Sequence, residues 1–401
     1  MKIKQMRVVT LSFLLLVGFF FSSVRAGAAE LYVCISTGNN QNPGTLALPF
    51  KNIDAALKKA ATGDTIKVAE GIYSGTFEIG FLEIDKAVIL MGGFAKGFGQ
   101  REVTKFPTVF QPNNASGAKS RKALINLVKN NDGFVLDGFV LDMGQRNSYS
   151  TTEGKPQGLE TGILLLPPSK QGRDNTTVTE PLLRIGNGNQ GGIIKIQNNV
   201  FVNGAQFAIQ GGIALGKLEI RNNVFVSNRM AAIEVWGTHG RDLAEAEIVG
   251  NSIVFSWSRL KDFGDMGYGV RIMTKMKYTI EKNLIGGAIL AGVDNTRFAK
   301  DENIFLKDNV FFLNTQGDLE YSPQSNTKLN LSATQFGDLP FASARGNVNP
   351  PRLDLALDKK YREGFEKALE TPGSMFANRY PWKSALDLFG SSATHGAQKN
   401  W

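Results

Sequence analysis

The sequence Ile-Lys-Ile-Gln-Asn-Asn-Val-Phe-Val at Ile194–Val202 is followed by Leu-Glu-Ile-Arg-Asn-Asn-Val-Phe-Val at Leu218–Val226, a copy displaced by 24 residues. Weaker copies occupy Glu247–Phe255, Thr279–Ile285 and Phe305–Phe312. The shared asparagines are Asn199, Asn223, Asn251, Asn283 and Asn309, with spacings of 24, 28, 32 and 26 residues. A recurring period in this range indicates a solenoid whose coils carry loops of variable length.

Each copy alternates apolar and polar residues as a half-buried strand does, turns at an asparagine, and resumes as Val-Phe-Val or a related sequence. Asparagine tolerates a left-handed backbone and bonds locally through its amide, which suits a tight turn. If every coil places its asparagine at the same corner, the amides stack into a ladder. These features predict an all-β fold, a parallel β-helix. A leucine-rich repeat would need a regular Leu-x-x-Leu-x-Leu frame, which the sequence lacks.

The first 29 residues read as a secretory signal peptide. Lys2, Lys4 and Arg7 precede the apolar run Val8–Phe21, and small residues follow from Ala26. The run of 14 residues is too short to cross a bilayer comfortably, and no later segment is a candidate span. We therefore expect a secreted or periplasmic protein with no membrane span in the mature chain.

The remaining chain is long enough for a large core, with 401 residues in total, 42% hydrophobic residues, 44 glycines and 20% charged residues. Loss of the leader removes four basic residues and no acidic one, which lowers the formal charge from +9 to +5. This modest charge favours an anionic glycan partner; we expect no nucleic-acid partner. Cys34 is the only cysteine, so an intrachain disulfide is impossible. We expect a monomer.

The segment after the leader resembles a known family. Gly63-Asp64-Thr65-Ile66 and Gly71-Ile72-Tyr73 follow a short amphipathic helix in which Ile53, Ala56 and Leu57 share a face. This region is similar to the N-terminal cap of right-handed parallel β-helix proteins of the pectate-lyase-like group, and the resemblance extends from about Leu31 to Asn314. It implies a right-handed coil. The group includes lyases, hydrolases, epimerases, tailspikes and adhesins, so it leaves the activity open.

The repeat sets the expected domain boundaries at 30–325 for the β-helix, 326–390 for a partly helical C-terminal cap and 391–401 for a tail. Leu353–Leu369 is amphipathic and is predicted to cover the C-terminal end of the coil. The tail from Ser391 is predicted to be frayed. Met143–Thr179 is rich in polar residues and is predicted to form long loops around one strand.

Functional side chains must point out of the coil. Ile209 and Ile233 each lie ten residues after a ladder asparagine, so Gln210 and Glu234 are predicted to be outward neighbours. The matching strand of the next coil is placed at Tyr268–Thr274, which sets Arg271 beside Glu234 at the surface and Trp236 one step along.

The predicted site combines this strand face with its flanking loops. Its candidate residues are Gln210, Glu234, Trp236, His239, Arg241, Asp242, Trp257, Asp262, Asp265, Tyr268 and Arg271. Aromatic rings offer flat faces for sugars to stack on, and an arginine can bind a uronate carboxylate through two hydrogen bonds. Gln210, Glu234, Trp236, Arg241 and Trp257 are assigned to substrate binding. In a purely structural interpretation, Glu234 and Arg271 form a surface salt bridge and the aspartates serve turns.

The chemistry that fits best is β-elimination or C5 epimerisation of an acidic polysaccharide. Arg271 would neutralise the carboxylate, and His239, Tyr268 or Lys275 would remove the adjacent proton. Asp262 and Asp265, with Glu234, are candidate Ca²⁺ ligands. A hydrolase is less well supported. Gly237–Gly240 and Gly269–Ile272 resemble polygalacturonase elements faintly, but the preceding coil lacks paired aspartates. The alternative of another class is a non-catalytic glycan-binding or cell-surface adhesion protein.

Overall fold

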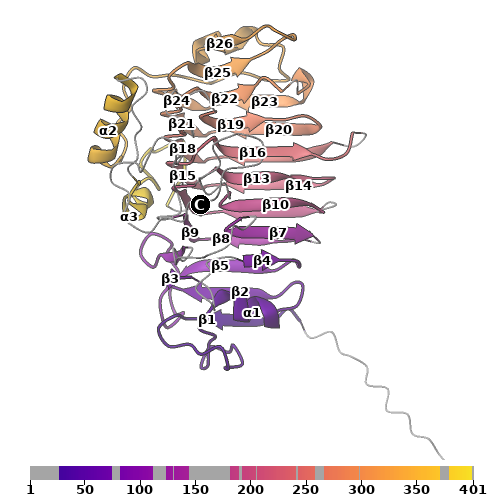
Figure 1. Cartoon of the computed structure of the whole chain (residues 1–401), viewed down its shortest axis with the longest axis vertical. Coiled ribbons are helices and arrows are strands. Elements are labelled where there is room, and N and C mark those ends of the chain that lie inside the picture. The colour runs from indigo at the N-terminus through magenta and orange to yellow at the C-terminus, as the bar shows by residue number, and fades with distance from the viewer. Residues whose placement is uncertain are drawn as a thin grey trace, which may run out of the picture.

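The computed structural model describes residues 27–74, 82–111, 123–129, 131–143, 181–188, 192–204, 206–240, 243–257, 266–297, 299–370 and 379–399. These residues wind into a rod of stacked coils, with the N-terminal elements at one end of the rod (Figure 1). Three sheets run along it, and successive strands pass from sheet A to sheet B to sheet C. The predicted leader up to residue 26 and most of the predicted loops of Met143–Thr179 lie outside the described residues.

The strand bounds are as follows. Sheet A consists of β1 (Glu30–Val33), β2 (Thr65–Ala69), β5 (Ile89–Phe94), β8 (Val135–Asp137), β11 (Ile193–Gln197), β14 (Lys217–Arg221), β17 (Ala244–Val249), β20 (Met276–Glu281) and β23 (Ile304–Lys307). Sheet B consists of β3 (Gly71–Tyr73), β6 (Thr108–Phe110), β9 (Phe139–Asp142), β12 (Val200–Val202), β15 (Val224–Val226), β18 (Ser252–Val254), β21 (Leu284–Gly286) and β24 (Val310–Phe312). Sheet C consists of β4 (Leu82–Ile84), β7 (Ile125–Lys129), β10 (Leu183–Gly188), β13 (Phe207–Ile213), β16 (Ala231–Gly237), β19 (Tyr268–Ile272), β22 (Ala291–Asn295), β25 (Gly317–Tyr321) and β26 (Leu329–Leu331).

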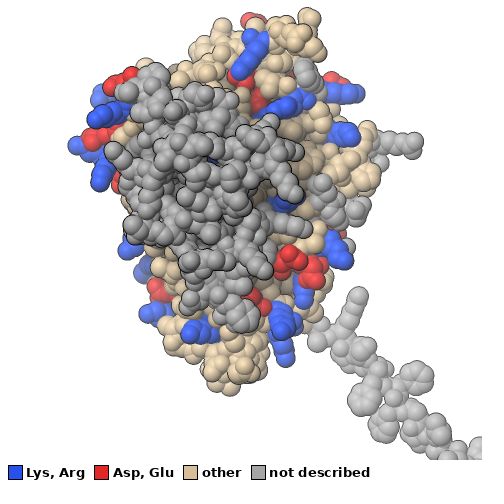
Figure 2. Space-filling model, viewed as in Figure 1, with Lys and Arg blue, Asp and Glu red and all other residues tan. Residues whose placement is uncertain are grey.

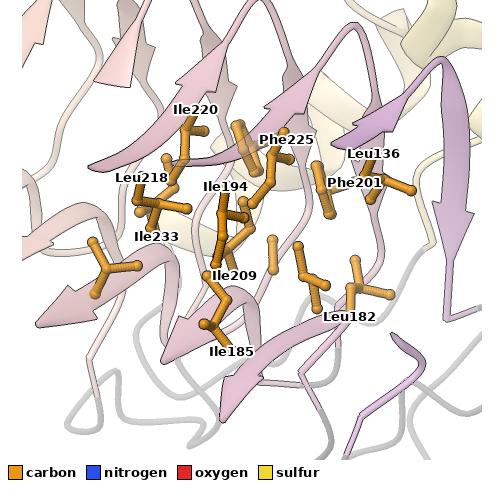
Figure 3. Close-up of a cluster of buried hydrophobic side chains, with 14 of the residues drawn as sticks. Leu136, Leu182, Ile185, Ile194, Phe201, Ile209, Leu218, Ile220, Phe225 and Ile233 are labelled. Atoms are coloured by element: carbon orange, nitrogen blue, oxygen red, sulfur yellow. The ribbon is translucent and has the colours of Figure 1, made fainter. Parts of the chain in front are cut away.

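Neighbouring strands pair in parallel, except at the end of the rod, where β25 and β26 are antiparallel. The two best repeats align in register, with Ile196 opposite Ile220 and Phe201 opposite Phe225. Phe201 and Phe225 stack inside the coil (Figure 3), with their ring centroids 4.9 Å apart and an interplanar angle of 8°. The predicted parallel β-helix and its inward residues are confirmed.

The asparagine ladder is also confirmed. The amide nitrogen of Asn199 donates to Oδ1 of Asn223 at 3.0 Å, and the same contact links Asn223 to Asn251. The series continues through Asn283 and Asn309 to Asn347, a sixth member that lies beyond the predicted β-helix boundary at residue 325. The ladder residues are buried or nearly so, hence each coil satisfies the polar groups of the next one.

Short helical segments close the ends of the core. At the N-terminal end, α1 (Ile53–Lys59) buries Ile53, Ala56 and Leu57, as predicted. At the C-terminal end, η2 (Asp301–Asn303) precedes the last strand of sheet A, and η3 (Ala333–Asp338) places Phe336 edge-on against Phe311 at 5.6 Å. No helix in the described ranges is long and apolar enough to cross a bilayer.

The amphipathic segment at Leu353–Leu369 does not cover the end of the coil, and that prediction is wrong. Its helix α2 (Lys359–Glu370) and the following α3 (Trp382–Leu386) lie along the side of the rod beside sheet B (Figure 1). Phe365 of α2 packs 4.8 Å from Phe255 between ring centroids. The physical reason is that sheet B presents outward valines, which attract the apolar stripe more strongly than an end already closed by η3 does.

The segment from Ser391 is not frayed over its described part, Ser391–Lys399. Ala397 is 1% exposed, and its backbone N–H donates to Oγ of Ser252. The backbone of Gln398 binds the side chain of Asn222 through both its N–H and its C=O. This short, polar sequence gave no hydrophobic signal, because most of what fixes it is backbone hydrogen bonding.

Candidate functional site on sheet C

One outward position of sheet C carries polar residues in register from coil to coil, and we call it the sheet C row. Its members are Glu83, Asn126, Arg184, Gln210, Glu234, Arg271, Asp294 and Glu320. The predicted placement of Glu234 between Gln210 and Arg271 is confirmed. Adjacent members stand about 4.8 Å apart along the rod, the spacing of paired strands.

The central members form one bonded network. Nε2 of Gln210 donates to Glu234 at 3.0 Å, and Nη1 of Arg271 donates to the other oxygen of Glu234 at 2.5 Å. Nε of Arg271 donates to Asp294 at 2.8 Å, and the second oxygen of Asp294 accepts hydrogen bonds from Thr296. Both charges of Glu234 and Asp294 are therefore directed at one guanidinium.

The charged residues of this network are buried, contrary to the expected surface salt bridge. Glu234 is 6% exposed, Arg271 3% and Asp294 0%. Burial disfavours the charge of Arg271, but Asp294 and Glu234 outweigh that effect and raise the pKa of the guanidinium. Alternation along a strand predicts that a side chain points out of the coil. Whether that side chain is exposed to solvent depends on the parts of the protein that pack over it.

Tyr268 lies outside the coil beside the network. Its hydroxyl donates to Glu320 at 2.7 Å, and its ring centroid lies 5.5 Å from the guanidinium carbon of Arg271. Glu320 also pairs with Lys328. Burial, followed by the charges of Asp294 and Glu320, raises the pKa of the Tyr268 phenol well above its usual range. The phenol is thus a proton donor at neutral pH, which makes it poorly suited to the role of base.

The open half of the row lies on the other side of Glu234, where Glu83 and Arg184 are exposed, Gln210 is half-buried and Asn126 alone is buried. Arg184 is exposed and makes no ion pair with any described residue, and it is aligned with the half-buried Gln210. Trp236 is also half-buried and lies over Gly212, where an added Cβ would come within 2.4 Å of the indole nitrogen. Glycine therefore allows the indole to lie close against the sheet. Within the described residues, the indole N–H has no hydrogen-bond acceptor.

The other predicted residues are distributed as follows. His239 is exposed just beyond β16, where Nδ1 lies 3.3 Å from Oγ1 of Thr238. Trp257 is 4% exposed and packs against α2, with its indole donating to the hydroxyl of Tyr361, so its environment is the sheet B side. Arg241, Asp242, Asp262 and Asp265 lie outside the described residues. Glu234, the third predicted Ca²⁺ ligand, is described and accepts hydrogen bonds from Gln210 and Arg271. Among described residues no acidic, histidine or cysteine cluster has metal-binding geometry.

Sequence reasoning missed Asp294 and Glu320. The signal was present, because Val293 lies ten residues after Asn283 and Leu319 lies ten residues after Asn309. The rule that located Gln210 and Glu234 therefore also places Asp294 and Glu320 in the outward row.

Comparisons with known proteins give the following similarities. A family described as a protein of unknown function (DUF1565) matches residues 36–139. No curated protein matches the chain. A rhamnogalacturonan lyase structure is 12% identical over 76% of this chain and 80% of its own, with a TM-score of 0.38. The pectate lyase Pel9A is 12% identical over 77% of this chain and 74% of its own, with a TM-score of 0.34.

A third structure, XylC in complex with xylose, is 13% identical over 71% of this chain, with a TM-score of 0.36. This chain spans 62% of the XylC chain. At such values the solved structures assign neither an activity nor a ligand to this chain.

Proposed function

Starting from a pectate-lyase-like parallel β-helix, we propose that this protein binds an acidic polysaccharide along the open half of the sheet C row. The observation that carries the proposal is the combination of an exposed Arg184, which has no ion-pair partner among the described residues, with Gln210 and the Trp236 indole on one sheet face. A flat indole stacks on the apolar face of a sugar ring, and a guanidinium forks onto a carboxylate. The row places a side chain at each coil along the rod, so it can contact successive sugar units of a polymer.

We assign the uronate to Arg184 in place of Arg271. Arg271 already donates to Glu234 and Asp294, and those two carboxylates offset its charge. A sugar carboxylate brought to Arg271 would meet both acidic groups at close range. Arg184 has no such competitor among the described residues, so it is the better anchor.

A second candidate function is β-elimination or C5 epimerisation at the same face. Tyr268 favours it, because a buried phenol kept protonated beside a guanidinium can donate a proton. In β-elimination the proton goes to the oxygen that leaves as its bond to C4 breaks, and in epimerisation it goes to the opposite face of the C5 carbanion. In this scheme Tyr268 is the acid. The exposed His239 is the base that removes the proton next to the carboxylate.

The binding proposal is tested by titrating the protein, without the predicted leader, with alginate, pectate, glycosaminoglycans and neutral glucans. Arg184→Gln and Trp236→Ala are each expected to weaken binding of the preferred polymer at least about tenfold, which corresponds to about 1.4 kcal/mol. Phe305→Ala is the matched control, since Phe305 is a half-buried outward aromatic on sheet A. Equal affinities for the parent and both sheet C variants would refute the site.

Catalysis is tested on the same polymers by ultraviolet absorbance of new unsaturated ends and by NMR analysis of C5 configuration. Tyr268→Phe keeps the ring and removes only the acid, so turnover is expected to fall by about two to four orders of magnitude while binding is retained. His239→Ala is expected to act similarly if His239 is the base. If the parent protein binds a polymer but does not turn it over, only the non-catalytic glycan-binding function is supported.

A further inference from the structure

The outer face of sheet B is apolar and is covered by the end of the chain. Val200, Val202, Val224, Val226 and Val254 are at most 1% exposed, although their neighbours in sequence, such as Phe201, fill the core of the coil. We call the described residues 379–399 the C-terminal strap. The strap contributes these buried apolar residues to the same cluster: Tyr380, Leu386, Leu388, Phe389 and Ala397.

Two asparagine side chains hold the strap by its backbone. Asn203 accepts a hydrogen bond from the N–H of Tyr380 at 2.8 Å and donates to its C=O at 3.0 Å. Asn222 does the same for Gln398, at 2.5 and 3.0 Å. Each amide thus reproduces the paired bonds of a neighbouring strand. We call Asn203 and Asn222 the clamps.

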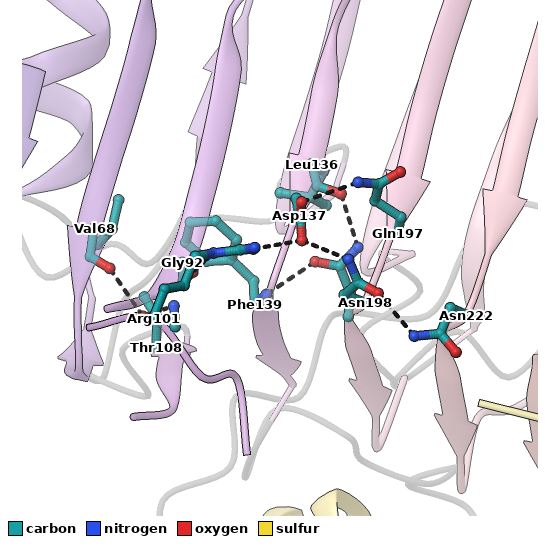
Figure 4. Close-up of polar contacts among 12 residues, drawn as sticks. Val68, Gly92, Arg101, Thr108, Leu136, Asp137, Phe139, Gln197, Asn198 and Asn222 are labelled. Atoms are coloured by element: carbon teal, nitrogen blue, oxygen red, sulfur yellow. Dashed lines mark hydrogen bonds and ion pairs between the residues drawn. The ribbon is translucent and has the colours of Figure 1, made fainter. Parts of the chain in front are cut away.

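The clamps lie at opposite edges of sheet B. Asn222 follows sheet A strand β14 at the corner that leads into sheet B, and Figure 4 shows it next to Asn198, which contacts Asp137. Asn203 follows β12, at the corner that leads out of sheet B. Both have left-handed backbones, with φ of 52° and 58°. The strap therefore spans the sheet between two points that hold it through backbone atoms, at Tyr380 and at Gln398.

We propose that this face of sheet B is a backbone-binding groove, which the strap fills within its own chain and which the strap of a second copy can fill in exchange. The clamps contact the strap only through its backbone atoms, and the valine surface between them is unstable when bare in water. A second copy carries the complementary strap. Mutual exchange gives a closed two-fold dimer with identical contacts in both grooves.

Exchange depends on concentration. A tethered strap competes at an effective concentration on the order of millimolar, so the monomer prevails in dilute solution. Dimers form when straps open while the protein is concentrated, and they persist after dilution because the two chains separate only when both straps are released. Sugar binding on sheet C has no part in this, so the two proposals are tested separately.

The experiment follows straps between chains by fluorescence energy transfer. Thr104 and Lys399 line the same cavity of about 280 Å³, which places a donor on Thr104→Cys close to an acceptor on Lys399→Cys. Cys34, the one other cysteine, is fully buried and does not compete for the label in the native protein. Separately labelled full-length chains are mixed at high concentration in urea below the unfolding midpoint, diluted, and compared with a chain carrying both labels.

Transfer between chains is expected, in a species of twice the monomer mass by light scattering. Asn203→Gly and Asn222→Gly remove the clamps but retain the left-handed turn, and each is expected to speed strap opening about tenfold or more by hydrogen exchange. Lys282→Gly is the matched control. It occupies an equivalent left-handed corner at φ 55°, and its backbone carbonyl still accepts from Gly396.

Two results overturn the proposal. In the first, the strap exchanges its amide hydrogens only with global unfolding, so it is not a separable occupant of the groove. In the second, the strap opens but no transfer between chains develops, so the groove does not accept a strap from another copy.

Discussion

Adjacent asparagines in one turn have different roles here. In each Asn-Asn turn the second residue, Asn199 or Asn223, points inward and joins the ladder, whereas the first, Asn198 or Asn222, adopts a left-handed backbone and points outward. The sequence predicts the ladder because the inward asparagine recurs in every coil. The outward position varies, with Gly250, Lys282 and Asp308 in later coils, and its contacts depend on the strap, which no repeat encodes.

The ladder should be costly to interrupt. Asn223→Ala removes the acceptor for the backbone N–H and the amide of Asn199, and the donor to Asn251, all of them buried. We expect a loss of about 3 kcal/mol in the free energy of unfolding, since buried polar groups left unpaired cost about 1–3 kcal/mol each. Urea denaturation measures it. Asn330→Ala, at an exposed asparagine on β26, is the control and should change stability by less than about 0.5 kcal/mol.

The charge of Arg271 should contribute more to the free energy of unfolding than the charge of an arginine in a surface ion pair does. Arg271→Met approximates the volume but leaves Glu234 and Asp294 buried without their cation, which is expected to cost about 3–5 kcal/mol. Adding Glu234→Gln and Asp294→Asn should restore part of the loss. A change of about 0–1 kcal/mol, as for an exposed pair, would show that the site is solvated in solution.

At the scale of elements, the three sheets use their outer faces differently. Sheet B is apolar and covered, sheet C carries the polar row, and sheet A carries a lattice of ion pairs such as Lys217 with Glu245 and Glu247. On the part of the surface that Figure 2 shows in colour, basic and acidic side chains are intermixed, which fits a solvated face. Alternation in the sequence predicts the inward residues of all three sheets. It cannot predict which outward face is buried, because that depends on segments that are distant in the sequence and fold over the sheet.

The sheet A lattice predicts a dependence on pH. Partial burial opposes the charge of Glu247, but the hydrogen bond from Lys217 and the charges of Arg221 and Lys217 outweigh it and lower the pKa of the carboxyl below its ordinary value of 4.5. Because the folded pKa is lowered, this stabilisation is fully present above pH 4.5 and is lost as pH falls through the folded pKa.

Glu247→Gln should therefore be less stable than the parent near pH 7, and the difference should shrink below the ordinary pKa of glutamate. Urea midpoints measured from pH 7 to pH 3 check this. Lys359→Ala, which breaks an exposed pair with Glu363 on α2, serves as the control with little effect at any pH. A constant difference across the range would mean that Glu247 acts by packing and not by charge.

At the scale of the whole molecule, the rod is a periodic coil fastened by a non-periodic segment. The repeat and the N-terminal motifs are enough to predict the coil, its ladder and its first cap, because each coil obeys the same local rules. The strap is not predictable in this way, since its contacts join residues 176 and 177 positions apart. The candidate site is intermediate: register predicts which residues align, but not that five of the eight residues in the row are buried.

Removing the strap should test this division of the molecule. A chain ending at residue 378 loses Tyr380, Leu388 and Phe389 from the sheet B cluster and uncovers valines that are otherwise sealed. The coil core lies on the other side of those strands, so far-ultraviolet circular dichroism should still show β-structure. Thermal stability should fall, and binding of a hydrophobic dye and self-association should rise, because a contiguous apolar face in water favours association. If the shortened chain stays monomeric, binds no dye and melts like the parent, the strap does not protect sheet B.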